Sequence, residues 1–223
     1  SSAKNMSPNV AQYIKKIFVV SDNDAYNRLY EFLGQEYFNE SLQRKGYRDT
    51  RVVHRLGPEG SSFSFEDNRY TNPFSFSDNE SLLYHQGEVW SKAPQQLDFL
   101  QEQVLGKAHV NKQDELIQEP FNFKVKNYIS LEDLTDILKA VIFHQYTPSH
   151  KRFELSDNDY AFLYDWMSRL PANSDFPEYE EKKDNYVKFY WNRDMPDHIR
   201  IFNKVGWAYG FLTGISYIID SQN

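Results

Sequence analysis

The residues best suited to chemistry are the tripeptide Ser21-Asp22-Asn23 and a lysine far along the chain, Lys204. Hydroxyl, amide and ammonium groups can pass protons and hold anionic ligands. The same tripeptide also begins at Ser77 and Ser156, where we expect a polar loop and a helix cap, respectively. Ser21 differs, because an apolar helical pattern ends on it and an amphipathic one leaves from it. Such a junction can hold side chains rigidly at a cleft, as catalysis requires.

Apolar residues at helical spacing predict five helices that position these groups. The first opens at Ser7-Pro8 and stops at Ser21, and the second has its cap among residues 22–24 and ends at Gly34. A third runs from about Glu36 to Lys45. The others begin at Ser130, which resembles a capping box with Asp133, and at Ser156, whose helix ends before Pro171.

The C-terminal part of the chain changes character, because β-branched and aromatic residues replace the helical stripe. Two strands are predicted, Ile199 to Lys204 and Tyr209 to Asp220, joined through residues 206–210. Earlier, Arg51 to His54 looks extended, and the Gly-, Ser- and Pro-rich stretch from there to Ser81 is predicted to be a long loop. Residues 82–128 give no consistent pattern beyond a possible short helix at Leu97 to Leu105.

Composition excludes several function classes. The 223 residues carry a net charge of -7 with no cluster of Lys and Arg, which argues against a nucleic-acid partner. No apolar run is long enough to span a bilayer. There is no Cys, no pair of the six histidines has the spacing of a helical metal site, and no glycine-rich phosphate loop follows a strand. We therefore expect no disulfide, no metal and no cofactor.

Val19 to Gly34 and Phe202 to Asp220 resemble the corresponding segments of class A β-lactamase-like serine hydrolases, within the β-lactamase and penicillin-binding protein superfamily. Residues 66–73 and 129–134 are similar too, so the resemblance covers nearly the whole chain. The motifs are S-D-N and K-T-G, the latter present here as Lys204-Val205-Gly206. The resemblance implies an α+β fold, an α/β sandwich of the serine β-lactamase type, with mostly the helical lobe and two C-terminal antiparallel strands present. Residues 1–223 would form one domain, truncated at both ends.

The resemblance also implies roles. A serine attacks a carbonyl carbon and forms an acyl-enzyme. Ser21 would carry a proton to the leaving nitrogen, Asn23 would hydrogen-bond the substrate amide, and Lys204 would anchor the substrate carboxylate. Gly206 would let substrate lie against the strand without interference from a Cβ atom. Val205 departs from the pattern, because it lacks the hydroxyl that helps to bind the carboxylate.

Two further parts of the family mechanism have weaker matches. Glu59 and Glu66 lie in the loop where a water activator could sit, although no E-x-x-L-N pattern surrounds them. Ser1-Ser2-Ala3-Lys4 matches S-x-x-K literally but lies too close to Ser21 and to a chain end. We therefore expect the nucleophile upstream of this chain.

The resemblance suggests hydrolysis of a β-lactam or a related amide or ester, in a periplasmic or secreted protein linked to antibiotic resistance. A D-Ala-D-Ala peptidase or acyltransferase acting on cell-wall peptide would share every residue named. A non-catalytic binding module with the same fold is the third possibility, favoured by Val205.

Overall fold

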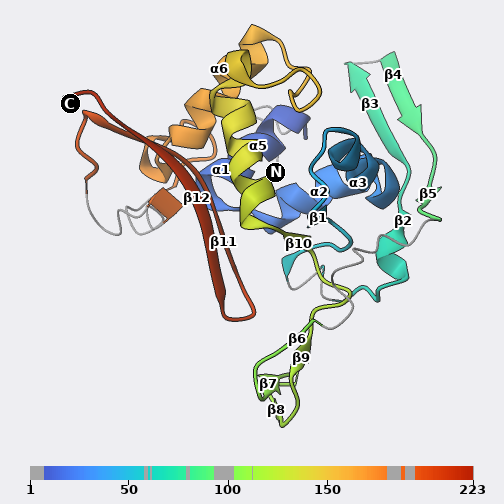
Figure 1. Cartoon of the computed structure of the whole chain (residues 1–223). Helices are drawn as coiled ribbons and strands as arrows, with labels where there is room; N and C mark the ends of the chain where they lie inside the picture. Colours follow the sequence, from blue (N-terminus) through green and yellow to red (C-terminus); the bar gives the residue numbers. More distant parts are fainter. Residues whose placement is uncertain are drawn as a thin grey trace.

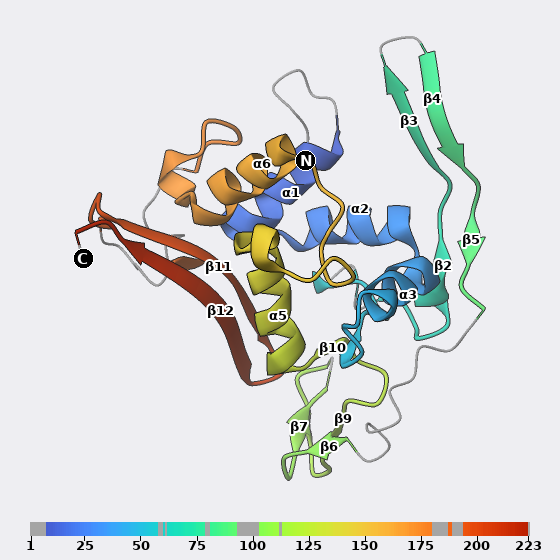
Figure 2. The ribbon, with the colours of Figure 1, turned by 45° about the horizontal axis from the view of Figure 1, so that its top comes forward.

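The computed structural model describes residues 8–57, 60, 62–78, 81–92, 103–111, 113–179, 187–188 and 194–222. Helices α1, α2, α5 and α6 lie in the middle, with a long C-terminal hairpin, β11–β12, on one side and a second hairpin, β3–β4, on the other (Figure 1). Figure 2 shows the same order from another direction. The mixture of helices and small antiparallel sheets is the α+β class that the sequence predicted.

Three helices open the chain, and local signals set their ends. Helix α1 spans Val10–Val20, α2 spans Asn23–Leu33 and α3 spans Gln35–Arg44. The side chain of Asn9 caps α1 by accepting the backbone N–H of Gln12 at 2.9 Å. Gly34 stops α2 with a φ of 70°, in the left-handed region that glycine adopts without steric cost. The predicted helices are confirmed, with α1 starting slightly later than expected.

The core forms where the later helices meet the hairpin. Helix α5, Leu131–Ile142, packs against β12, and α6, Asp157–Ser168, packs against β11 and α1. Leu138, Met167 and Phe202 form the buried cluster, and one residue comes from each of α5, α6 and β11. Burial of three such side chains stabilises the fold by roughly 1.5–3 kcal/mol each. The hairpin that carries Lys204 is therefore fixed to the helices through its first strand.

The C-terminal hairpin is formed by β11, Ile199–Ala208, and β12, Phe211–Asp220. Its turn is Tyr209-Gly210, with φ values of 52° and 81°. Positive φ at both residues of a two-residue turn matches the right-handed twist of paired strands. At this turn, Lys126 donates a hydrogen bond of 2.9 Å to the Tyr209 hydroxyl, so the hairpin tip contacts the β6–β9 region.

Short antiparallel pairs make up the rest of the described sheet structure. The pairs are β1–β10, β2–β5, β3–β4, β6–β9 and β7–β8. Their bounds are Thr50–Arg51 (β1), Tyr70–Thr71 (β2), Phe74–Asp78 (β3), Ser81–Gln86 (β4), Val89–Trp90 (β5), Val104–Leu105 (β6), His109–Val110 (β7), Leu116–Ile117 (β8), Phe121–Asn122 (β9) and Tyr128–Ile129 (β10).

The long loop predicted up to Ser81 is wrong for residues 70–78, and Ser77 lies in β3 rather than in a loop. Phe74 and Phe76 alternate with serines, and both rings pack on Phe32 of α2, at centroid distances of 5.3 Å and 5.1 Å. This period of two is a strand signal that the high serine content obscured. The possible helix at Leu97 to Leu105 lies partly outside the described residues, and its end, Val104–Leu105, is β6.

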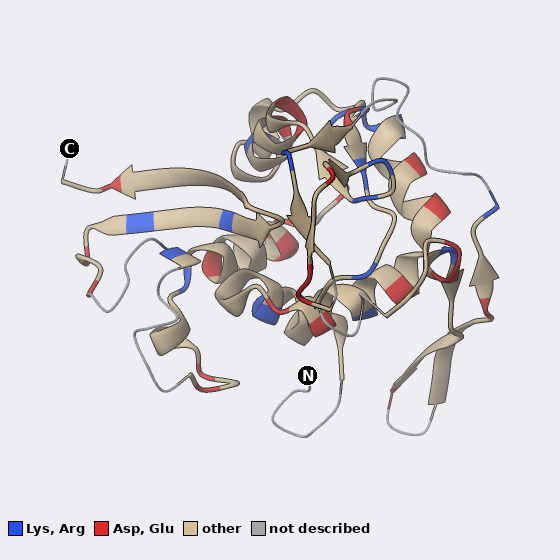
Figure 3. Ribbon diagram, turned by 90° about the horizontal axis from the view of Figure 1, so that it is seen from below, with Lys and Arg blue, Asp and Glu red and all other residues tan. Residues whose placement is uncertain are grey.

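Basic and acidic residues are interspersed over the helices in the described part of the chain (Figure 3). In the same residues, no helix is both long and apolar enough to cross a membrane. No group of three or more His, Cys, Asp or Glu residues there could hold a metal ion.

Candidate functional site

Ser21 lies at the tight junction between α1 and α2. It has a φ of 56°, in the left-handed region, and its backbone N–H still bonds to the carbonyl of Ile17 at 3.1 Å. A residue with a Cβ in this conformation costs roughly 1–2 kcal/mol. Neighbouring interactions must therefore stabilise this backbone conformation of Ser21.

Asp22 makes two such stabilising interactions through its side chain. One carboxylate oxygen caps α2 by accepting the Ala25 backbone N–H at 2.8 Å, and the other pairs with Lys16 at 2.6 Å. Burial opposes ionisation of Asp22, but the hydrogen bonds with Lys16 and Ala25 outweigh it, and the pKa lies below its usual value. Because Asp22 does the capping, the hydroxyl of Ser21 is released from that role. Asp22 therefore stabilises the junction.

Lys204 reaches Ser21 from β11. Its Nζ donates to the Ser21 hydroxyl oxygen at 2.7 Å, across 183 positions of sequence, and to the carbonyl of Val205 at 2.5 Å. Burial lowers the pKa of Lys204 to about 8. At neutral pH the side chain is therefore mostly a cation, with a minor neutral fraction. A lysine with this pKa can hold an anion and can also exchange a proton near physiological pH.

A second buried lysine, Lys188, lies beside this strand, and sequence reasoning missed it. The side chain is 0% exposed, and its Nζ donates to Asn203 Oδ1 at 2.6 Å and to the Met167 carbonyl at 2.5 Å. Asn203 in turn donates to the Val187 carbonyl at 2.6 Å. Burial, together with the nearby charge of Lys204, lowers the pKa of Lys188 to about 7.

These bonds join the end of α6, the 187–188 segment and β11 immediately before Lys204. The sequence gives no reason to expect Lys188 in the core. Lysine is almost always exposed, and no local pattern around this residue indicates burial.

The other predicted substrate contacts lie nearby in the chain but do not bond to this pair. Asn23 is the first residue of α2 and is exposed, and no hydrogen bond links its side chain to Ser21 or Lys204 within the described residues. Gly206 is exposed on β11 opposite Thr213. A Cβ atom at Gly206 would meet only ordinary contacts, the nearest being the Thr213 carbonyl oxygen at 3.7 Å. The fold itself therefore does not require glycine there, and a passing ligand would gain the space.

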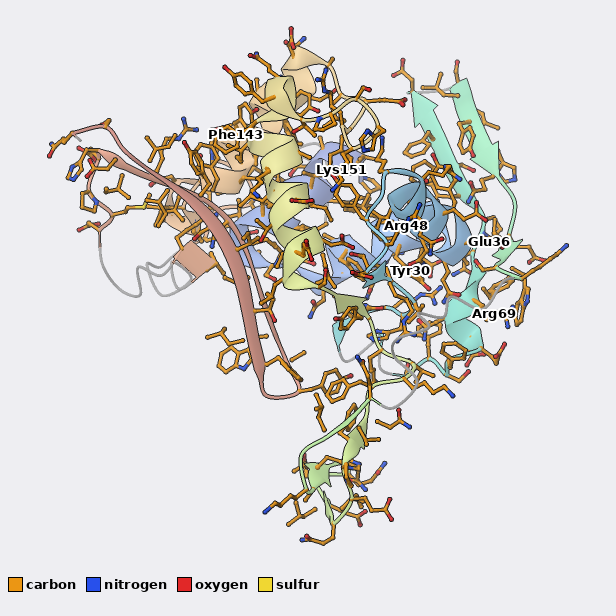
Figure 4. All side chains as sticks on the ribbon, in the orientation of Figure 1. Tyr30, Glu36, Arg48, Arg69, Phe143 and Lys151 are labelled. Carbon is orange, nitrogen blue, oxygen red and sulfur yellow. The ribbon has the colours of Figure 1, made fainter. Side chains whose placement is uncertain are left out.

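The acids predicted as water activators are not brought to this pair. Glu66 precedes a short 3₁₀ helix, η1, which spans Asp67–Arg69, and its carboxylate pairs with Arg69 at 3.0 Å while remaining 59% exposed. Arg69 lies on the β2–β5 side, across the helices from β11 (Figure 4). Glu59 and the Ser1 to Lys4 segment lie outside the described residues.

The family follows from a comparison over almost the whole length. A model of the beta-lactamase enzyme family matches residues 2–221. The chain belongs to this family. Searches of curated proteins and of solved structures gave no match. Membership places the chain in a superfamily of serine hydrolases and assigns neither a substrate nor a catalytic residue.

Proposed function

We propose that this family member is a hydrolase that cleaves a β-lactam or a related amide or ester through an acyl-enzyme. The observation that carries the proposal is the 2.7 Å hydrogen bond between Lys204 and Ser21, which joins two motifs from opposite ends of the chain. The hydroxyl of Ser21 passes a proton to the leaving group, the nitrogen of an amide or the oxygen of an ester, and Lys204 holds the anionic part of the substrate and supplies positive charge beside that hydroxyl.

The remaining residues shape what can bind. Exposed Asn23 offers its amide to the substrate, and Gly206 leaves room along the edge of β11. Val205 supplies no hydroxyl, so carboxylate recognition depends more heavily on Lys204 than it would with threonine at that position. With this weaker carboxylate recognition, a related amide or ester is as suitable a substrate as a conventional β-lactam.

The geometry also favours a second assignment within the same chemistry, in which Ser21 is itself the nucleophile. The neutral fraction of Lys204 then takes the hydroxyl proton while the Ser21 oxygen bonds to the carbonyl carbon, and the resulting ammonium protonates the leaving nitrogen of an amide or the leaving oxygen of an ester. Serine–lysine pairs of this kind catalyse acyl transfer on other folds.

Mass spectrometry of the full-length protein, labelled with a fluorescent penicillin or a fluorophosphonate, tests both assignments. An adduct on another serine, formed roughly 10²–10⁴-fold more slowly in Ser21→Ala, supports proton transfer by Ser21. An adduct on Ser21 that disappears in Ser21→Ala supports the serine–lysine pair. If neither reagent modifies any serine, the protein is not an acyl-transfer enzyme of this kind, and the binding-module alternative stands.

A further inference from the structure

A second candidate site lies on the β2–β5 side of the molecule, across the helices from β11, the strand that carries Lys204 (Figure 1). It is an open hollow of about 400 Å³, within the size range of small-molecule sites. Its lining mixes aromatic, hydroxyl and carboxylate side chains, and we refer to it as the aromatic cleft. The lining residues are Ser62, Phe63, Asp67, Tyr70 and Trp90.

Hydrogen bonds hold the walls of the aromatic cleft in place. Tyr70 and Trp90 are directly opposite each other in the β2–β5 pair, with ring centroids 6.5 Å apart. Arg69, labelled in Figure 4, ties η1 to the end of β5 by donating to the Ser91 carbonyl at 2.7 Å. Within η1, Asn68 is 2% exposed, and its Oδ1 accepts the backbone N–H of Arg55 at 2.9 Å. A ligand would therefore meet a surface that needs little ordering, which reduces the entropy lost on binding.

Two aromatic rings of the aromatic cleft remain accessible to solvent. Phe63 is 41% exposed and Trp90 is 50% exposed. Each ring already has a guanidinium against it: Arg55 lies 4.4 Å from the Phe63 centroid, and Arg69 lies 5.6 Å from the Trp90 centroid. Both guanidinium groups are ion-paired, Arg55 with Glu31 and Arg69 with Glu66, but each already uses the electrostatic potential of the ring that it contacts, so the exposed ring surface suits a neutral C–H face better than an ammonium ion.

Asp67 gives the aromatic cleft a strong hydrogen-bond acceptor. Hydrogen bonds from the Ser64 side chain and backbone hold the pKa of Asp67 below its usual value, so the carboxylate is ionised at neutral pH. No ion pair joins it to a cation within the described ranges, although Arg69 pairs with neighbouring Glu66. An ionised carboxylate accepts hydrogen bonds from hydroxyl groups strongly and repels anionic ligands.

We propose that the aromatic cleft binds a neutral saccharide. A pyranose ring combines a C–H face, which stacks on the exposed ring of Trp90, with hydroxyl groups that donate to Asp67. An acidic sugar would be repelled by the Asp67 carboxylate, and an ammonium compound would compete for the rings with the guanidinium groups already there. The proposal does not depend on Ser21 or Lys204, so it holds or fails separately from the acyl-transfer function.

Calorimetric titration of the whole protein with maltotetraose, cellotetraose and triacetylchitotriose tests this, with choline as the cationic probe. We expect at least one saccharide to bind and choline not to bind. Trp90→Ala should weaken saccharide binding about tenfold or more. Trp207→Ala is the matched control, because Trp207 is 79% exposed on β11, outside the aromatic cleft, and its loss should leave saccharide binding unchanged.

Asp67→Asn provides a second variant in case Trp90→Ala fails to fold, because the asparagine oxygen can still accept the Ser64 N–H that Asp67 accepts at 3.0 Å. This variant should weaken saccharide binding without changing the melting temperature by more than a few degrees. The proposal is overturned if no saccharide binds, if choline binds instead, or if Trp90→Ala and Asp67→Asn bind as tightly as wild type.

Discussion

The same Ser-Asp-Asn sequence occupies two very different places, at Ser21 and at Ser156. Ser156 is the N-cap of α6, and it forms a complete capping box: its hydroxyl oxygen accepts the Asp159 N–H at 3.2 Å, and the Asp159 carboxylate accepts the Ser156 N–H at 2.9 Å. At the other site, Ser21 ends α1, while the next residue, Asp22, caps α2. Moving the cap by one residue leaves the hydroxyl of Ser21 facing Lys204, whereas that of Ser156 is bound within its own helix turn.

The third occurrence, Ser77-Asp78, lies in β3, and its Asn79 is outside the described residues. Of the three serines that begin this tripeptide, all within the described residues, Ser21 is the one whose hydroxyl bonds to a lysine from another element, and we propose a chemical role for that copy.

The sharpest test of this difference is Lys204→Met, which leaves Ser21 in place without its partner. We expect acylation by carboxylate-bearing donors to fall roughly 10²–10³-fold, because a preorganised electrostatic contact is lost. Neutral esters should lose far less. The measurement is acylation rate against both donor types, with Lys139→Met, whose side chain is 62% exposed, as the control. An equal loss for both donors, with the melting temperature unchanged, would contradict the anchoring role and favour Lys204 as the base for Ser21, whereas an equal loss with a lowered melting temperature would mean structural damage.

The pH dependence of binding gives a second test. With a pKa of about 8, Lys204 is largely protonated at pH 7 and largely neutral at pH 9. The KM for carboxylate-bearing donors should therefore rise about tenfold between these pH values, while the KM for neutral esters stays level. A flat profile for both donor types would show that the charge of Lys204 does not hold the substrate.

Lys188 should make stability depend on pH. Its pKa is about 7 in the folded protein, against an ordinary value of 10.5, so between these values the unfolded chain holds one more proton than the folded one. Stability then rises with pH, and the burial penalty is fully present only below about pH 7.

Lys188→Met removes this contribution. The melting temperature of wild type, minus that of the variant, should therefore increase as pH rises from 7 to 9.5. Lys139→Met should track the wild type throughout. If the melting temperatures of Lys188→Met and wild type change in parallel with pH, Lys188 does not titrate as a buried lysine.

The smallest effect is expected at Ser156. Ser156→Ala should lower the free energy of unfolding by about 1 kcal/mol, the usual cost of a lost helix cap, without changing acylation. Ser21→Ala should do the reverse, reducing acylation with little loss of stability. Denaturant unfolding and probe labelling of the two variants would separate the two serines. Slower acylation in Ser156→Ala would remove the contrast between them.

Much of this fold could be predicted from local signals. Helical spacing, the caps at Ser130 and Ser156 and the stop at Gly34 gave the helices, because these interactions span only three or four residues. The strands of β11–β12 were predicted from β-branched and aromatic content. The β3–β4 hairpin was missed, because the serines around Phe74 and Phe76 made a period-two strand pattern resemble a polar loop, and the packing partner of both rings, Phe32, lies far away in the sequence.

The sequence by itself determined which residue types were available for chemistry, the family and the order of the two motifs. Only the tertiary structure decided which serine of three meets Lys204, because a hydrogen bond across 183 positions depends on how α1, α6 and β11 pack. It also decided that Lys188 is buried, since a lysine enters a core only where distant groups satisfy it, here the Met167 carbonyl and the Asn203 side chain. Local sequence specifies elements, whereas desolvation and long-range contacts set the protonation of the lysines that those elements bring together.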